Sequence, residues 1–98
     1  MRLSPPAGGA AALEAVILPG GQGYVYGSKL SPLSSLQTYQ LWGAVGGQLI
    51  SYGLLGTDPA TVIPFRAGPG VSALAVTEEV AGGVVSTAHQ PVAVGSLT

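Results

Sequence analysis

The chain has 98 residues, of which 47% are hydrophobic and 7% charged. This length makes one domain with a modest core, and the hydrophobic fraction excludes global disorder. Its lack of cysteine excludes disulfides and cysteine-based metal sites, and its net charge of −1 with three scattered cations (Arg2, Lys29 and Arg66) excludes a nucleic-acid interface, which needs clustered Lys and Arg.

The N-terminal segment is rich in proline and glycine. Ser4–Gly9 reads SPPAGG, which predicts a flexible leader over residues 1–10 and a folded domain over residues 11–98. Its prolines and glycines leave the leader little to bury. The longest apolar run, Ala10–Leu18, contains Glu14 and is far shorter than the roughly 20 residues that span a bilayer. We therefore expect no direct membrane insertion by this fragment.

The remaining chain alternates short apolar runs with glycine and proline, at the spacing of roughly 8–12 residues that is typical of sandwiches and barrels. Its 16 glycines and 8 prolines interrupt almost every window that a helix would need. The sequence predicts an all-β fold, an antiparallel β-sandwich of about seven short strands that is Ig-like in general architecture. In chain order, the predicted strands are Leu13–Leu18, Gly23–Lys29, Thr38–Val45, Gln48–Leu55, Thr61–Phe65, Ala73–Glu78 and Pro91–Val94.

The strand pair around Gly46-Gly47 allows a prediction of register. Two glycines accept positive φ, so they indicate a two-residue hairpin turn in which Val45 faces Gln48. Paired residues share a face of the sheet. The face predicted to be buried carries Tyr39, Leu41, Val45, Ile50, Tyr52 and Leu54. The opposite face carries Gln40, Trp42 and Ala44, set against Gly53, Ser51 and Leu49, and it leaves Trp42 as a possible contact residue.

Two tyrosines alternate with Val25 on the second predicted strand. Tyr24 and Tyr26 share one face, either as a ligand-stacking stripe or as half-buried sheet packing. With Trp42 they form the possible contact surface. The alternative function that follows is a cell-surface adhesion or carbohydrate-binding β-sandwich that uses these three aromatic residues as a platform.

Residue types that support catalysis are sparse. Glu78 and Glu79 are adjacent, so in a strand they point to opposite faces, and we expect both to be solvated. His89 is the only histidine and is expected to be an ordinary loop residue. The sequence contains no G-x-S-x-G nucleophile elbow, and Gly20–Gly23 reads as a hairpin turn. We predict a non-enzymatic protein with no cofactor and no metal.

Five motifs nevertheless occur in a distinctive order. They are Leu30–Leu33 (LSPL), Thr38–Trp42 (TYQLW), Gln48–Gly53 (QLISYG), Ala73–Glu78 (ALAVTE, continuing in Ala81-Gly82-Gly83) and Pro91–Gly95 (PVAVG). This order resembles the C-terminal extracytoplasmic domain of anti-sigma-K factors, over about Leu13 to Leu97. The chain departs from the family pattern at Glu79-Val80, where Glu-Pro is usual, and at Thr87–Pro91, where Pro-Thr-Gly-Pro is common. The residues that carry the motif and core are Tyr39, Leu41, Trp42, Tyr52, Leu74 and Val76.

The resemblance implies a regulatory outer domain of a single-pass membrane protein. In the parent, a cytoplasmic domain absent from this chain would bind an extracytoplasmic-function sigma factor. Regulated proteolysis would release that sigma factor, with site proteases acting near the leader. The resemblance implies that this leader is a juxtamembrane linker, the alternative being an added segment. The implied location is the extracytoplasmic face of the cell membrane. From the residues themselves, exposed sheet edges with few charges leave a homodimer possible.

Overall fold

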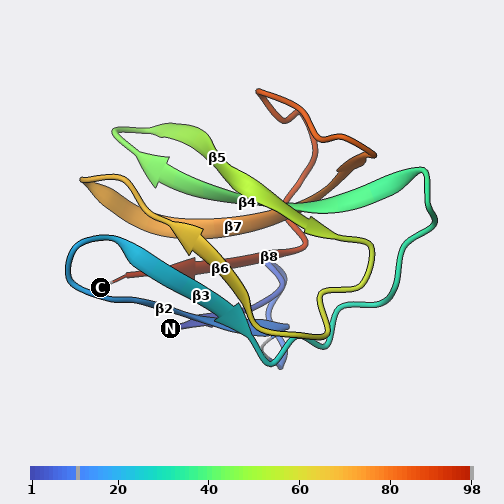
Figure 1. The fold of residues 1–98 in the computed structure, drawn as a ribbon, viewed down its shortest axis with the longest axis horizontal. Helices are drawn as coiled ribbons and strands as arrows, with labels where there is room; N and C mark the ends of the chain where they lie inside the picture. The colour runs from blue at the N-terminus through green and yellow to red at the C-terminus, as the bar shows by residue number, and fades with distance from the viewer. Residues whose placement is uncertain (11, 98) are drawn as a thin grey trace.

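The protein is a sandwich of two four-stranded antiparallel sheets, seen in a computed structural model that describes residues 1–10 and 12–97 (Figure 1). One sheet has the strand order β1-β2-β3-β6 and the other the order β5-β4-β7-β8. The described residues form no helix, and so none that could cross a membrane. The strands are β1 (Arg2–Leu3), β2 (Leu13–Ile17), β3 (Gln22–Tyr26), β4 (Gln37–Val45), β5 (Gln48–Gly56), β6 (Ile63–Arg66), β7 (Val71–Val80) and β8 (Ala93–Ser96).

The predicted sandwich is confirmed, and each of the seven predicted strands overlaps an observed one. Side chains that alternate along the strands meet between the sheets, as expected for two faces packed about 10 Å apart. Buried apolar residues from both sheets form this core: Leu3, Leu13, Ala15, Val25, Tyr39, Leu41, Leu55, Phe65, Ala67, Leu74, Val76 and Ala93. The family-motif residues Leu41, Leu74 and Val76 are fully buried in it, so these three act in folding.

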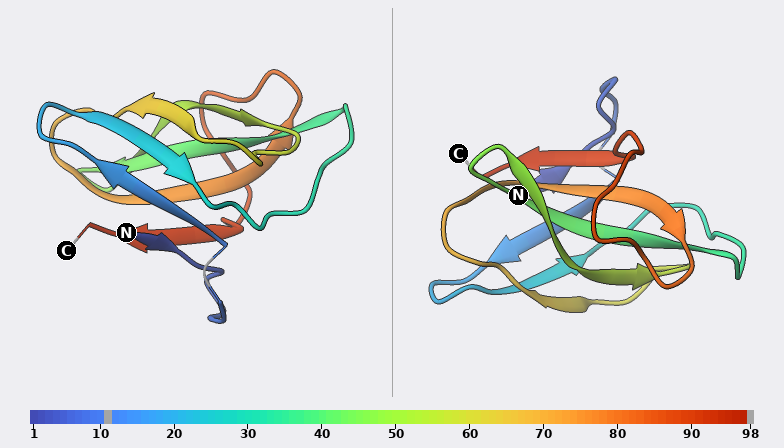
Figure 2. Two further views of the ribbon diagram at one scale, coloured as in Figure 1. Left: turned by 60° about the horizontal axis from the view of Figure 1, so that its bottom comes forward. Right: turned by 90° about the horizontal axis from the view of Figure 1, so that it is seen from above.

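The additional strand, β1, lies inside the segment that the sequence assigned to a flexible leader. Leu3 pairs with Leu13 and is fully buried in the core. Ser4 and Val94 exchange two backbone hydrogen bonds of 2.8 Å, which join β1 to β8 and close this side of the sandwich (Figure 2). Residues 1–4 thus belong to the folded body, and residues 5–10 lie in the connection to β2. A two-residue strand is too short to show periodicity in the sequence.

The β4–β5 hairpin follows the predicted register near its turn and departs from it farther away. Val45 pairs with Gln48 and Gly43 with Ile50, as expected, but Leu41 pairs with Gly53 because Tyr52 is an extra, bulged residue. A second irregularity makes Leu55 the extra residue between Leu54 and Gly56. Each bulge inserts one residue and re-aims the side chains that follow it.

The bulges overturn part of the predicted buried face. Leu55 enters the core with 5% of its surface exposed, while Leu54 is 44% exposed. Tyr52 is half-buried and its ring lies over Gly43, where a Cβ atom would stand 2.2 Å from the ring. Because this ring covers the inner side of the hairpin and β5 is an edge strand, Ile50 remains 45% exposed. The prediction that Ile50 and Leu54 are buried is therefore wrong.

Candidate functional site

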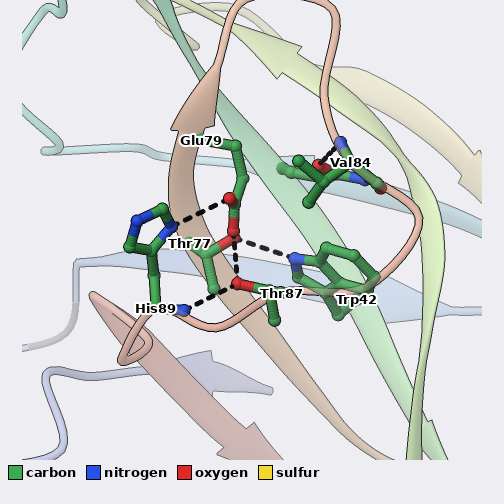
Figure 3. A network of polar contacts seen from close by, with 7 residues as sticks. Trp42, Thr77, Glu79, Val84, Thr87 and His89 are labelled. Atoms are coloured by element: carbon green, nitrogen blue, oxygen red, sulfur yellow. Dashed lines mark hydrogen bonds and ion pairs between the residues drawn. The ribbon is translucent and has the colours of Figure 1, made fainter.

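The most elaborate polar arrangement lies on the outer face of β4 and β7, under the connection between β7 and β8. We call this connection, residues 81–92, the late loop. Gln40 and Trp42 of β4 and Thr77 and Glu79 of β7 alternate with core residues, so they point away from the core. The late loop folds back across them (Figure 3). All four side chains are consequently buried, although they lie outside the space between the sheets.

Trp42 is on the face that the sequence predicted, but it is not exposed. The late loop covers its indole, leaving none of its surface accessible (Figure 3). Its Nε1–H donates a 2.9 Å hydrogen bond to Thr77 Oγ1. The prediction of Trp42 as a contact residue is therefore wrong for the folded domain, because the late loop returns over this face and covers it.

Glu79 is the polar centre of the arrangement. Its carboxylate accepts hydrogen bonds from Thr77 Oγ1 at 2.6 Å and from Thr87 Oγ1, and it lies 2.9 Å from His89 Nδ1 (Figure 3). Thr87 and His89 both belong to the late loop, so the carboxylate joins the loop to β7. The residue is 3% exposed, which contradicts the expectation that it is solvated. The expectation of opposite directions is confirmed, since Glu78 is half-exposed and pairs with Tyr39.

The surroundings of Glu79 favour its ionised form. Burial alone raises the pKa of the carboxyl, but the hydrogen bonds from Thr77, Thr87 and His89, with the positive charge that His89 can carry, bring the pKa below its ordinary value. A buried carboxylate is stable only when its oxygens are satisfied in this way. The same contact corrects the interpretation of His89, whose side chain is 61% exposed but fastens the loop to a buried acid.

Gln40 provides a second attachment for the late loop. Its Nε2 donates to Val84 O at 2.8 Å and to Ser51 Oγ at 2.7 Å, while its Oε1 accepts from Val84 N at 3.0 Å. The carboxamide thus pairs with the backbone of Val84 as a neighbouring strand would. Gly83 makes the approach possible, because a Cβ atom there would lie 2.6 Å from Leu54 Cδ2 and 3.1 Å from Gln40 Oε1.

This arrangement holds a loop in place but lacks the parts of an active centre. Glu79 and His89 resemble the acid and base of a catalytic triad, yet in the described residues no hydroxyl is hydrogen-bonded to the other ring nitrogen of His89. Nor do the described residues include a group of three or more His, Cys, Asp or Glu side chains that could hold a metal ion. What the contacts do show is that the late loop is fastened to β4 and β7.

The predicted aromatic platform is not assembled. Tyr24 and Tyr26 lie on the outer face of β3, opposite to the core residue Val25, so their predicted common face is confirmed. Trp42 lies under the late loop on the other sheet. The two sheets separate the tyrosines from the tryptophan, which contradicts a single contact surface made of all three. No observation then favours the carbohydrate-binding alternative.

Sequence reasoning missed Gln40, Glu79, Thr87 and His89 as parts of one site. A signal was present in the polar residues that alternate with core residues beside Trp42 on two strands, Gln40 on β4 with Thr77 and Glu79 on β7. Buried strands that carry such residues on their outward face indicate a cover that satisfies them. The sequence did not show that the late loop provides this cover, because the path of a loop without periodicity cannot be predicted from local pattern.

A known protein family matches most of the chain. The family model described as "Anti-sigma-K factor rskA, C-terminal" matches residues 2–92. No curated protein and no solved structure matches the chain. The matched range includes β1, the TYQLW segment, Glu79 and the whole late loop. The chain therefore belongs to the family of anti-sigma-K factor C-terminal domains, as the order of its motifs predicted.

Proposed function

We propose that this chain is the extracytoplasmic regulatory domain of a membrane-anchored anti-sigma factor, whose parent controls an extracytoplasmic-function sigma factor through regulated proteolysis. The observation that carries the proposal is the family match over residues 2–92. The sigma factor is bound by a cytoplasmic domain outside this chain. The domain acts by being folded, which keeps site proteases from the segment near its N-terminus.

The position of the N-terminal segment supports this mechanism. Leu3 is fully buried, and Ser4 is hydrogen-bonded to Val94 of β8. A protease needs an extended and accessible segment, so cleavage within residues 1–4, which are paired with β2 and β8, requires β1 to detach first. Local stability at β1 is then the variable that a signal would change. The low charge of the domain, 7% of residues against about 25% in an average soluble protein, fits a non-cytosolic module.

A reporter of sigma-dependent transcription in cells that carry the full-length parent tests the proposal. Leu41→Asp places an unpaired charge at a fully buried core position and unfolds the domain. We expect constitutive reporter activity together with a shortened parent protein. Ser35→Asp, a substitution at an exposed loop position, is the matched control and leaves the reporter repressed.

Two further measurements separate the parts of the proposal. An external protease added to intact, wall-permeabilised cells degrades the domain if it lies outside the membrane and spares it if it lies inside. Deleting the intramembrane protease of the host restores repression in the Leu41→Asp strain if proteolysis is the route. A reporter that stays repressed while the domain is demonstrably unfolded overturns the proposal.

A further inference from the structure

The late loop contains a segment that is fastened at both ends and free between them. On one side, Gln40 holds both backbone groups of Val84, and on the other, Glu79 holds the side chains of Thr87 and His89. Val85, between these attachments, is 96% exposed. In the described residues no protein group is hydrogen-bonded to the backbone of Val85 or Ser86. This short stretch is presented to solvent in the way that favours proteolytic nicking.

The residues around this stretch define the kind of protease that fits. Ala81–Ala88 reads AGGVVSTA, which contains only small or β-branched side chains and no charge. A serine protease whose specificity pocket takes small apolar side chains, as elastase does, would accept Val85. Hydrolysis of the Val85–Ser86 amide consumes one water and leaves a carboxylate on Val85 and a free amine on Ser86.

The consequence of this cut follows from the place of β8. The chain from Ser86 onward contributes β8, which is held by its pairing with β7 on one side and by the two hydrogen bonds between Val94 and Ser4 on the other. Ahead of the strand, Thr87 and His89 attach the same piece of chain to Glu79. Of the four residues of β8, only Ala93 is fully buried, so the strand adds no more than a methyl group to the core. β1 has only two residues and lies between β2 and β8, and the backbone of β8 approaches it so closely that a Cβ atom on Gly95 would stand 2.4 Å from Arg2 O.

We propose that the Val85–Ser86 bond is a regulatory cleavage site for a protease that selects small apolar residues, and that its hydrolysis releases β8 and unseats β1. Once the covalent link is cut, residues 86–97 are held only by their own contacts. These are the contacts of Thr87 and His89 with Glu79, the pairing of β8 with β7, the two hydrogen bonds to Ser4 and the burial of Ala93. When β8 leaves, Ser4 loses its partner and Leu3 loses its cover. The use of the site in signalling rests on the proposed function, because it would expose the N-terminal segment to a second protease.

Limited digestion of this chain with elastase, followed by mass mapping of the first products, tests the site. We expect the first cut after Val85. Val85→Asp places a charge in the specificity pocket and slows that cut by at least about tenfold. Val62→Asp is the matched control, since Val62 is 61% exposed in the loop before β6, and it leaves the rate unchanged. Equal rates for Val85→Asp and wild type, or a first cut within residues 5–10, overturn the site.

Two more measurements test how the attachment of the late loop controls the cut, and whether the cut releases β1. Gln40→Ala loosens one attachment, and we expect the cut after Val85 to become about fivefold faster with no new cuts in the core strands. In the nicked protein, the amides of β1 exchange hydrogen faster than in the intact chain, and unchanged exchange there refutes the release of β1. Neither assay contains a membrane or a sigma factor, so a failure here leaves the cell reporter as the separate test of the proposed function.

Discussion

The contacts of the buried Glu79 carboxylate determine how much stability the domain should lose when this side chain is removed. Glu79→Ala deletes the acceptor for Thr77 and Thr87 and the contact with His89. Each hydroxyl bond to a buried charge contributes about 1–1.5 kcal/mol net, and the contact with His89, which is 61% exposed, adds about 0–1 kcal/mol. We expect the free energy of unfolding to fall by about 2–4 kcal/mol, or Tm by about 10–30 °C for a domain of this size.

Urea and thermal unfolding, followed by circular dichroism and by the fluorescence of Trp42, measure this loss. Glu78→Ala is the control, because Glu78 is the neighbouring acid, is half-exposed, and makes no side-chain hydrogen bond within the described residues. We expect it to change the free energy of unfolding by less than about 0.5 kcal/mol. The reasoning is refuted if Glu79→Ala is as mild as Glu78→Ala, or if the emission of Trp42 in the folded variant is unchanged.

Two titrating side chains and one closely packed glycine give further predictions. The lowered pKa of Glu79 means that its stabilisation is complete above the ordinary range of glutamate and is lost as pH falls through the folded-state pKa, so Glu79→Gln should flatten the acid limb of a stability–pH profile. Burial, then the charges of Glu78 and Asp58, raise the pKa of Tyr39, so stability should fall as pH rises past the ordinary range of tyrosine, and Tyr39→Phe should remove that slope. Gly43→Ala forces a Cβ atom into the Tyr52 ring and should cost about 1–3 kcal/mol in urea titrations, whereas Ala44→Gly next to it should cost less.

The fold was predictable where local pattern decides it. Gly46-Gly47 set the turn and the first pairs of the β4–β5 hairpin, and alternation placed Tyr39 and Leu41 in the core with Trp42 on the other side. The pattern failed where one extra residue enters a strand. A bulge at Tyr52 or Leu55 depends on which side chain fits the space between the sheets, and no local signal in the sequence specifies that.

The candidate site was less predictable, because its contacts join a strand to an irregular loop. Glu79 and His89 are ten positions apart, and their approach requires the late loop to turn back at Gly82 and Gly83, which both have positive φ. Two glycines indicate a turn but not its direction. β1 shows the same limit, since Arg2-Leu3 is recognisable as a strand only when β2 and β8 are seen on either side of it.

Acrylamide quenching of Trp42 tests most directly the claim that the late loop is fastened over the outer face of β4 and β7. Trp42 is the single tryptophan of the chain, so its emission reports this one position. In the native protein we predict blue-shifted emission with little quenching, and in the Gln40→Ala, Glu79→Ala double variant, red-shifted emission with strong quenching while the circular dichroism of the sheets persists. Red-shifted, readily quenched emission from the native protein would contradict the account.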